Sequence, residues 1–171
     1  SAIPSPMYQR EGVSSISDAA GNTILYSDGR NLYNGNSFTV GNGLNGSTMS
    51  AQSCLIAPSP ASVNQYYVFT MNDWITSNNG LSYKLVDMSN NNVMTQPSVS
   101  VNTGVREQLA AVYHANCKDI WIICHEGGKN AAANNNYLAY LLTDQGLQTT
   151  PVISSVGMTY SGINRYGSIK F

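Results

Sequence analysis

The residues of this chain that come nearest to a metal-dependent catalytic motif are His125 and Glu126, which follow an apolar run. They match the first half of the HExxH pattern, in which two histidines on a helix bind zinc and the glutamate acts as general base. Lys129 stands where the second histidine is needed, and the local pattern predicts a strand in place of the helix. His114 is one predicted strand away and could approach His125, which gives at most two ligands without a placed carboxylate. We therefore expect a polar role at a strand end and no metal site.

Carboxyl groups are the next candidates, because glycoside hydrolysis needs two of them at a defined separation. Most of the six aspartates stand in turn signals such as Asp28-Gly29, where hydrogen bonds to the local backbone explain them. Residues 76–83 fit a degenerate Asp-box with Asn78 at the aspartate position, and that box is a structural turn of sialidase-type propellers. The glutamates that remain are Glu11, Glu107 and Glu126.

Nucleophile and nucleotide-binding motifs are missing from the sequence, which has no G-x-S-x-G elbow, no P-loop and no dinucleotide fingerprint. The glycine-rich segment Gly41–Gly46 lacks a following Lys-Ser/Thr and a helix, so it is predicted to be a flexible surface loop. We expect no catalytic, cofactor-binding or metal-binding residues, no cofactor and no enzymatic activity.

The composition narrows the class of protein. Only 10% of the 171 residues are charged, against roughly a quarter in typical soluble proteins, and Asn, Ser, Thr, Gly and Tyr take their place. The four arginines and four lysines are scattered and form no basic stripe, so nucleic acid is not an expected partner. No apolar run reaches the ~20 residues of a membrane-spanning helix. Three cysteines are an odd number. Cys54 could meet Cys124 only if adjacent blades align them, and we expect buried free thiols.

Aromatic residues divide into two groups by position. Those inside predicted strands are expected to pack between sheets, whereas Tyr8, Tyr33, Trp74 and Tyr160 lie nearer to loops. Rings in loops could stack on sugars, and loop asparagines could bind hydroxyl groups, so a glycan or a surface protein is a candidate partner.

Two stretches of the chain follow one template about 54 residues apart. Gln52 matches Gln108 and Tyr67 matches Trp121, and each stretch has three strong strand signals and a shorter Ser/Val strand. A unit of this length with four short strands is typical of one β-propeller blade. The fold class predicted is therefore all-β: a propeller segment of about three four-stranded antiparallel blades plus the first strand of a fourth.

The predicted organisation has five parts. They are an N-terminal extension (1–10), unit 1 with a polar loop from Gly35 to Ser50 (11–50), unit 2 (51–104), unit 3 (105–157), and the start of the next unit (158–171), in which Gly167–Phe171 is predicted to be a strand. Because three blades do not close a ring of four to eight, we expect the chain to be a portion of a longer polypeptide or to be completed by neighbouring subunits.

The amino-acid sequences of several segments resemble those of a known family. Ile16–Gly29, Ala51–Pro58, Tyr83–Met88 and Leu109–Asp119 resemble the amino-terminal, WD40-like propeller region of large Bacteroidota surface proteins. Those proteins are exported by type IX secretion and carry a gliding-motility-associated C-terminal domain. The resemblance covers residues 11–171 and implies an extracellular or cell-surface location, without supplying catalytic residues.

Three functional hypotheses follow. The first is a non-enzymatic scaffold, adhesion or binding module of a large secreted bacterial protein. The second is part of a carbohydrate-active propeller enzyme whose catalytic residues lie outside this chain. The third is a structural subunit of an extracellular assembly, completed by neighbouring copies.

Overall fold

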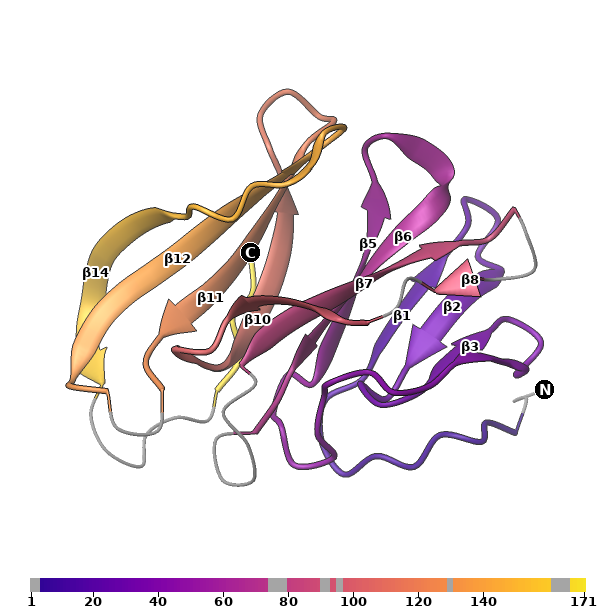
Figure 1. The fold of residues 1–171 in the computed structure, drawn as a ribbon, viewed down its shortest axis with the longest axis horizontal. Coiled ribbons are helices and arrows are strands. Elements are labelled where there is room, and N and C mark those ends of the chain that lie inside the picture. The colour runs from indigo at the N-terminus through magenta and orange to yellow at the C-terminus, as the bar shows by residue number, and fades with distance from the viewer. Residues whose placement is uncertain (1–3, 74–79, 90–92, 95–96, 129–130, 161–166) are drawn as a thin grey trace.

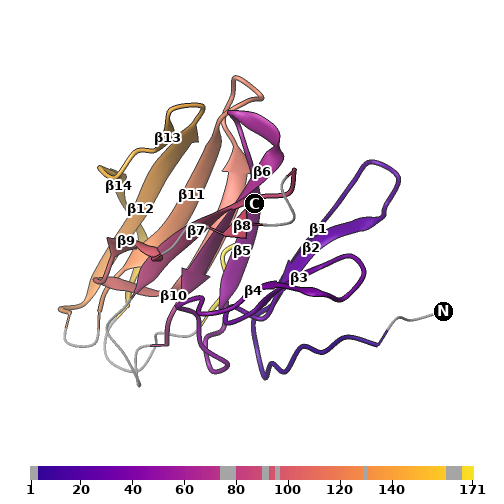
Figure 2. The same cartoon turned by 45° about the vertical axis from the view of Figure 1, so that its right-hand side comes forward.

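The protein is built from strands and turns. The computed structural model describes residues 4–73, 80–89, 93–94, 97–128, 131–160 and 167–171, and in these ranges it has fourteen β-strands and no helix. The strands form three antiparallel sheets that lie side by side in sequence order (Figures 1 and 2). The all-β class predicted from the sequence is confirmed.

The first sheet is a simple meander. Each strand pairs with its sequence neighbour, and tight turns connect them. Gly21 and Gly29 supply the positive φ values, 86° and 82°, that two of these turns require. The strands are β1 (Ser14–Ser17), β2 (Thr23–Ser27), β3 (Leu32–Asn34) and β4 (Thr39–Gly41).

The second and third sheets share one topology. In each, four strands follow in sequence order, and a fifth strand pairs with the other half of the third strand. The second sheet contains β5 (Cys54–Ser59), β6 (Ser62–Met71), β7 (Leu81–Asp87), β8 (Val93–Met94) and β9 (Val99–Asn102). The third contains β10 (Val105–Tyr113), β11 (Ile120–Glu126), β12 (Asn134–Thr143), β13 (Gly146–Leu147) and β14 (Val152–Tyr160).

Each sheet has a near face, toward the preceding sheet in the chain, and a far face, toward the following one. On the far face of the second sheet, Leu55, Phe69 and Tyr83 form one cross-strand row. The matching row of the third sheet is Ala110, Ile123 and Ala139. Side chains alternate between the two faces along each strand.

The core lies in two layers between the sheets. The layer between the second and third sheets holds Phe69, Met71, Leu81, Ile122 and Leu142, all fully buried. The layer between the first and second sheets is smaller. It is formed by Leu25, Leu32, Leu44, Ile56, Tyr66, Val68 and Val86. The middle sheet is therefore covered on both faces, which explains the almost continuous apolar run of β6.

Close contacts at the β2–β3 turn join the first sheet to the segment that leads into the second. A Cβ at Gly29 would overlap the Ser53 hydroxyl, and one at Gly46 would overlap the Gly29 carbonyl. Gly46 donates its N–H to the Gly29 oxygen at 2.8 Å, and Leu44 donates to the Arg30 oxygen at 3.1 Å. Only glycine fits such an approach.

Two predictions about segments outside the main strands are wrong. Residues 35–50 were expected to be a loop, yet they contain β4, and Leu44 within the glycine-rich segment 41–46 is only 6% exposed. The segment is therefore a docked connection and not a flexible surface loop, because its amides bond to the first sheet. The prediction of a strand at Gly167–Phe171 is also wrong: Ile169 donates its N–H to a side chain, the Gln52 amide oxygen, and these residues form no ladder.

Candidate functional site

A β-bulge in β10 concentrates the buried polar side chains of the third sheet. Val105 pairs with Glu126 and Leu109 with Cys124, so three residues of β10 stand opposite the single residue His125. The three bulged residues are Arg106, Glu107 and Gln108, which are 4%, 1% and 8% exposed. Bulges re-aim side chains and occur often beside functional sites, so this position is the first candidate for chemistry.

The bulge and the start of the second sheet exchange hydrogen bonds. The Glu107 carboxylate (Oε2) accepts the Ala51 N–H at 3.0 Å. In return, the Gln52 amide oxygen (Oε1) accepts the Leu109 N–H at 2.8 Å, and it also accepts the Ile169 N–H at 3.0 Å. We call Gln52 and Glu107 the polar latch, because these two side chains hold the main chains of two sheets together.

Arg106 and His125 meet at one main-chain oxygen. The Glu126 carbonyl accepts Arg106 Nε–H at 3.2 Å and His125 Nδ1–H at 2.6 Å. Gly127, at φ 137°, lies against the guanidinium group and leaves no room for a Cβ. Burial lowers the pKa of His125, and the hydrogen bond to the Glu126 carbonyl opposes this change. A neutral histidine that donates to a main-chain oxygen is therefore the expected state at neutral pH.

The side chain of Glu126 makes hydrogen bonds separate from those of its main-chain carbonyl. Its Oε2 accepts Asn136 Nδ2–H at 2.7 Å, and Asn136 Oδ1 in turn accepts the Ser155 hydroxyl at 2.6 Å. The Tyr137 ring stands edge-on to His125, with 4.8 Å between ring centroids. These contacts join β11, β12 and β14 at one end of the sheet.

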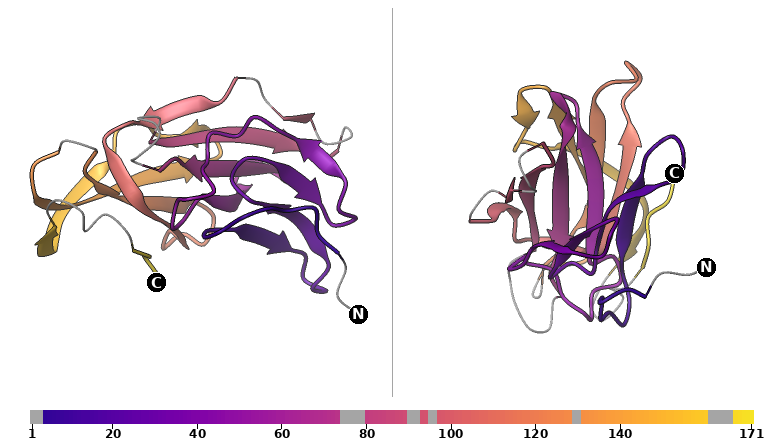
Figure 3. Two further views of the ribbon diagram at one scale, coloured as in Figure 1. Left: turned by 90° about the horizontal axis from the view of Figure 1, so that it is seen from below. Right: turned by 90° about the vertical axis from the view of Figure 1, so that its right-hand side faces the viewer.

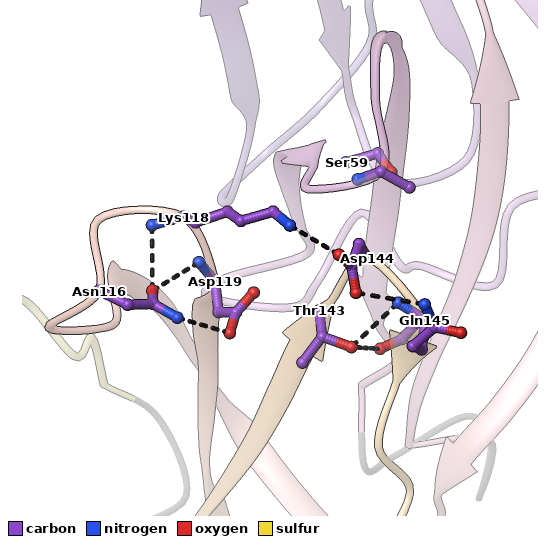
Figure 4. Close-up of polar contacts among 9 residues, drawn as sticks. Ser59, Asn116, Lys118, Asp119, Thr143, Asp144 and Gln145 are labelled. Carbon is purple, nitrogen blue, oxygen red and sulfur yellow. Dashed lines mark hydrogen bonds and ion pairs between the residues drawn. The ribbon is translucent and has the colours of Figure 1, made fainter.

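The hairpin tips form a second polar cluster, at the opposite end of the third sheet (Figure 4). Asn116 Oδ1 accepts the N–H groups of Lys118 and Asp119, and Asn116 Nδ2–H donates to Asp119 Oδ2 at 2.7 Å. Lys118 Nζ reaches across to Asp144 Oδ2 in the β12–β13 turn at 2.6 Å. The hydrogen bond from Lys118 holds the pKa of Asp144 below its ordinary value. Polar side chains therefore bond within the β10–β11 turn and link it to the β12–β13 turn.

The two histidines lie far apart. His114 follows the end of β10 and pairs its N–H with the Asp119 oxygen, whereas His125 stands at the other end of β11. Six residues of extended strand separate these points, roughly 20 Å. The expectation that His114 could approach His125 is wrong, and the described part of the chain holds no group of three or more metal-ligating side chains.

The other predicted candidates are dispersed as well. Glu107 and Glu126 are near the bulge, while Glu11 is exposed in the segment before β1. The described rings Tyr8 and Tyr33 differ in exposure, at 64% and 5%. Trp74 and Asn78, with the first half of the Asp-box segment (76–79), lie outside the described residues.

All three cysteines are free thiols. Cys54 and Cys124 are both buried, Cys124 in the layer between the second and third sheets, and burial raises the pKa of each to about 12. Cys117 is exposed at the tip of the β10–β11 turn, with a φ of 58°, so the expectation that all three thiols are buried is wrong for this residue.

A role in the candidate site was not predicted for Gln52, Arg106, Gln108 or Asn136. The available signal was the repeat itself, because Gln52 and Gln108 occupy the same place in the two templates. A second signal was the sequence Arg-Glu-Gln at the start of an otherwise apolar strand.

Comparison with models of protein families, with curated proteins and with solved structures found no match. Among the described residues, no helix is long and apolar enough to cross a membrane.

Proposed function

We propose that this chain is a non-enzymatic scaffold and binding module: a β-propeller segment of a large bacterial protein that is secreted or held at the cell surface. The observation that carries the proposal is that the ionisable side chains at the bulge are bonded to the protein's own main chain. Glu107, Arg106 and His125 bond to main-chain groups, and Gln52 completes the latch between two sheets. Such groups stabilise the stack of sheets and leave the exposed turns for recognition.

The propeller architecture is supported by how the sheets meet. The first strands of successive sheets are in contact, β1 with β5 and β5 with β10, so these strands line one side of the stack. Turns joining the first and second strands of all three sheets lie along one edge of the molecule (top of Figure 1). In a propeller, blades are arranged in this way around a common axis.

The surface location and the bacterial origin are supported by the low content of charged residues and by the resemblance to surface proteins exported by type IX secretion. For binding, we favour the edge formed by the first-to-second-strand turns. Asp18 and Asn116 make these turns rigid through their own hydrogen bonds to neighbouring backbone N–H groups. A rigid polar surface loses little entropy when it binds a glycan or a protein.

The test is a glycan array probed with the labelled chain, followed by hydrolysis assays on every glycan that is bound. We expect binding without turnover, and weaker binding when Asn116→Ala loosens the β10–β11 turn. Asn22→Ala, in the corresponding turn of the first sheet, is the comparison that shows which turns contact the glycan. Turnover that disappears in both Glu107→Gln and Glu126→Gln would overturn the proposal in favour of a carbohydrate-active enzyme.

A further inference from the structure

Asparagine followed by glycine is the sequence most prone to spontaneous deamidation, because the glycine nitrogen, without a side chain beside it, can approach the asparagine amide. The first sheet and the segment that leads out of it hold three such pairs among the described residues: Asn34-Gly35, Asn42-Gly43 and Asn45-Gly46. This sheet forms one end of the molecule (indigo to violet in Figure 3). Since the three pairs have the same sequence, their surroundings in the fold decide which of them can react.

The pair Asn34-Gly35 is held by hydrogen bonds on both groups that would have to meet. The Gly35 N–H, whose nitrogen would attack, donates to the Ile24 carbonyl at 3.1 Å. The Asn34 amide oxygen, on the carbon that would be attacked, accepts the N–H groups of Asn36 and Phe38, both at 3.1 Å. The two groups cannot meet unless this turn opens first, so the folded state protects Asn34.

The pair Asn45-Gly46 is held by its contact with the β2–β3 turn. The Gly46 N–H donates to the Gly29 carbonyl at 2.8 Å, and a Cβ at Gly46 would overlap the same oxygen. On the other side of the pair, Leu44 is buried and donates its N–H to the Arg30 carbonyl at 3.1 Å. The main chain around Asn45 is therefore fixed, and ring closure would require it to leave the first sheet.

The pair Asn42-Gly43 lies in an exposed arch between two fixed points. Strand β4 ends at Gly41, which pairs with Leu32, and the docked connection begins at Leu44. Both residues of the pair are exposed, and a Cβ on Gly43 would meet nothing within 4 Å. In the described part of the chain, the Gly43 N–H makes no hydrogen bond. The attacking nitrogen and its target are therefore free to approach each other.

We propose that Asn42 is the site at which the folded protein deamidates, ahead of Asn34 and Asn45. The Gly43 nitrogen attacks the side-chain amide carbon of Asn42 and forms a C–N bond. The C–NH₂ bond breaks, and ammonia leaves with the proton of the attacking nitrogen. Water then opens the resulting succinimide ring. Opening at the side-chain carbonyl gives aspartate, whereas opening at the main-chain carbonyl gives isoaspartate, in which the chain runs through the side chain.

Deamidation changes the surface of the arch without removing a contact that holds the sheets. Either product adds one negative charge to a chain whose net charge is −1. The isoaspartate product also lengthens the main chain by one carbon between β4 and Leu44. Because Asn42 and Gly43 are exposed, this change can be absorbed within the arch, and the first sheet should remain folded in both forms.

The test is incubation of the folded chain in a mildly alkaline buffer, followed by digestion with chymotrypsin and mass spectrometry of the peptides. Cleavage after Tyr33, Phe38 and Leu44 places the three pairs in different peptides. Cleavage after Trp74 and Leu81 separates a fourth pair, residues 79–80, which begins outside the described residues.

The result expected is a difference in rate that depends on the folded state. Conversion at Asn42 should be at least about tenfold faster than at Asn34 or Asn45, since the amides that follow those two must first lose a hydrogen bond. In guanidinium chloride the three rates should become similar, because the sequence around each attacking nitrogen is then equally exposed.

Asn42→Gln is the test variant, and Asn45→Gln is its matched control. Glutamine would have to close a larger and slower-forming ring, so Asn42→Gln should abolish conversion at the arch, whereas Asn45→Gln should leave the rate at Asn42 unchanged. Comparable rates at the three pairs in the folded chain would overturn the inference. So would conversion at Asn34 or Asn45 ahead of Asn42, or an Asn42 that reacts only after denaturation.

Discussion

Replacing Gln52 by alanine tests whether the polar latch holds the second and third sheets together. The substitution removes the acceptor of two main-chain N–H groups, those of Leu109 at 2.8 Å and Ile169 at 3.0 Å. Leu109 is 2% exposed, so water cannot easily take the place of the lost oxygen. A buried donor left without a partner costs about 1–3 kcal/mol, and with a smaller contribution from the half-buried Ile169 we expect a loss of about 2–4 kcal/mol. That is a large share of the roughly 5–15 kcal/mol of net stability typical of a folded domain.

The assay is urea denaturation followed by tryptophan fluorescence, with Gln145→Ala as the matched control. Gln145 lies in the exposed β12–β13 turn, where its side chain donates to Asp144 at 3.4 Å, so its removal should change stability by less than about 0.5 kcal/mol. With a urea dependence of about 2 kcal/mol per molar, the Gln52→Ala midpoint should fall by about 1–2 M. Amide exchange at Leu109 should also accelerate. Equal midpoints for the two variants would refute the latch.

Three further predictions concern backbone fit, pH and thiol access. Gly29→Ala should destabilise the protein by about 2–4 kcal/mol, because Gly29 has a positive φ and a Cβ there would overlap Ser53. Gly21 also has a positive φ but faces open space, so Gly21→Ala should cost only about 1 kcal/mol. Comparable losses for the two variants in thermal melts would contradict the close approach at Gly29. Burial lowers the pKa of His125 below 6.5, so as the pH falls the unfolded chain binds a proton before the folded chain does. The free energy of unfolding should therefore decrease as the pH drops below 6.5. His125→Gln should abolish this pH dependence in denaturation titrations. Cys117 should react with iodoacetamide in the native protein, and mass spectrometry should find a single adduct until denaturant is added. Early labelling of either buried thiol, Cys54 or Cys124, would show that the packing around that residue opens.

The pattern of the sequence predicted the strands and the similarity between the second and third sheets well. Runs such as Tyr66–Thr70 and Ile120–Cys124 are rich in β-branched and aromatic residues, and glycine marks turns such as Asp28-Gly29. These signals are local, so they can be recognised without knowing which residues pack against the strands. β4 was missed for the same reason, because its three residues form a strand only by pairing with β3.

The candidate site could not be predicted to the same degree. Glu107 is 1% exposed, although charged residues are rarely buried to this extent. The burial of Glu107 depends on the bulge in β10, which aims its carboxylate at the Ala51 N–H, just before the second sheet begins. Nothing in the neighbouring sequence specifies where that donor lies. The predicted approach of the two histidines failed because the β10–β11 hairpin pairs His114 with Asp119, at the opposite end of β11 from His125.

The sequence by itself determined the class of element, the low charge that argues against nucleic acid, and the absence of the familiar catalytic motifs, because these properties depend on residue types and short spacings. Only the tertiary structure decided what His125, Glu126 and the other reactive side chains bond to. It placed His114 and His125 at opposite ends of β11 and turned Glu107 into half of a latch between sheets. The physical reason is that hydrogen-bond partners 56 or 57 residues apart, such as Ala51 with Glu107 and Gln52 with Leu109, are chosen by how whole sheets pack and not by the residues beside them.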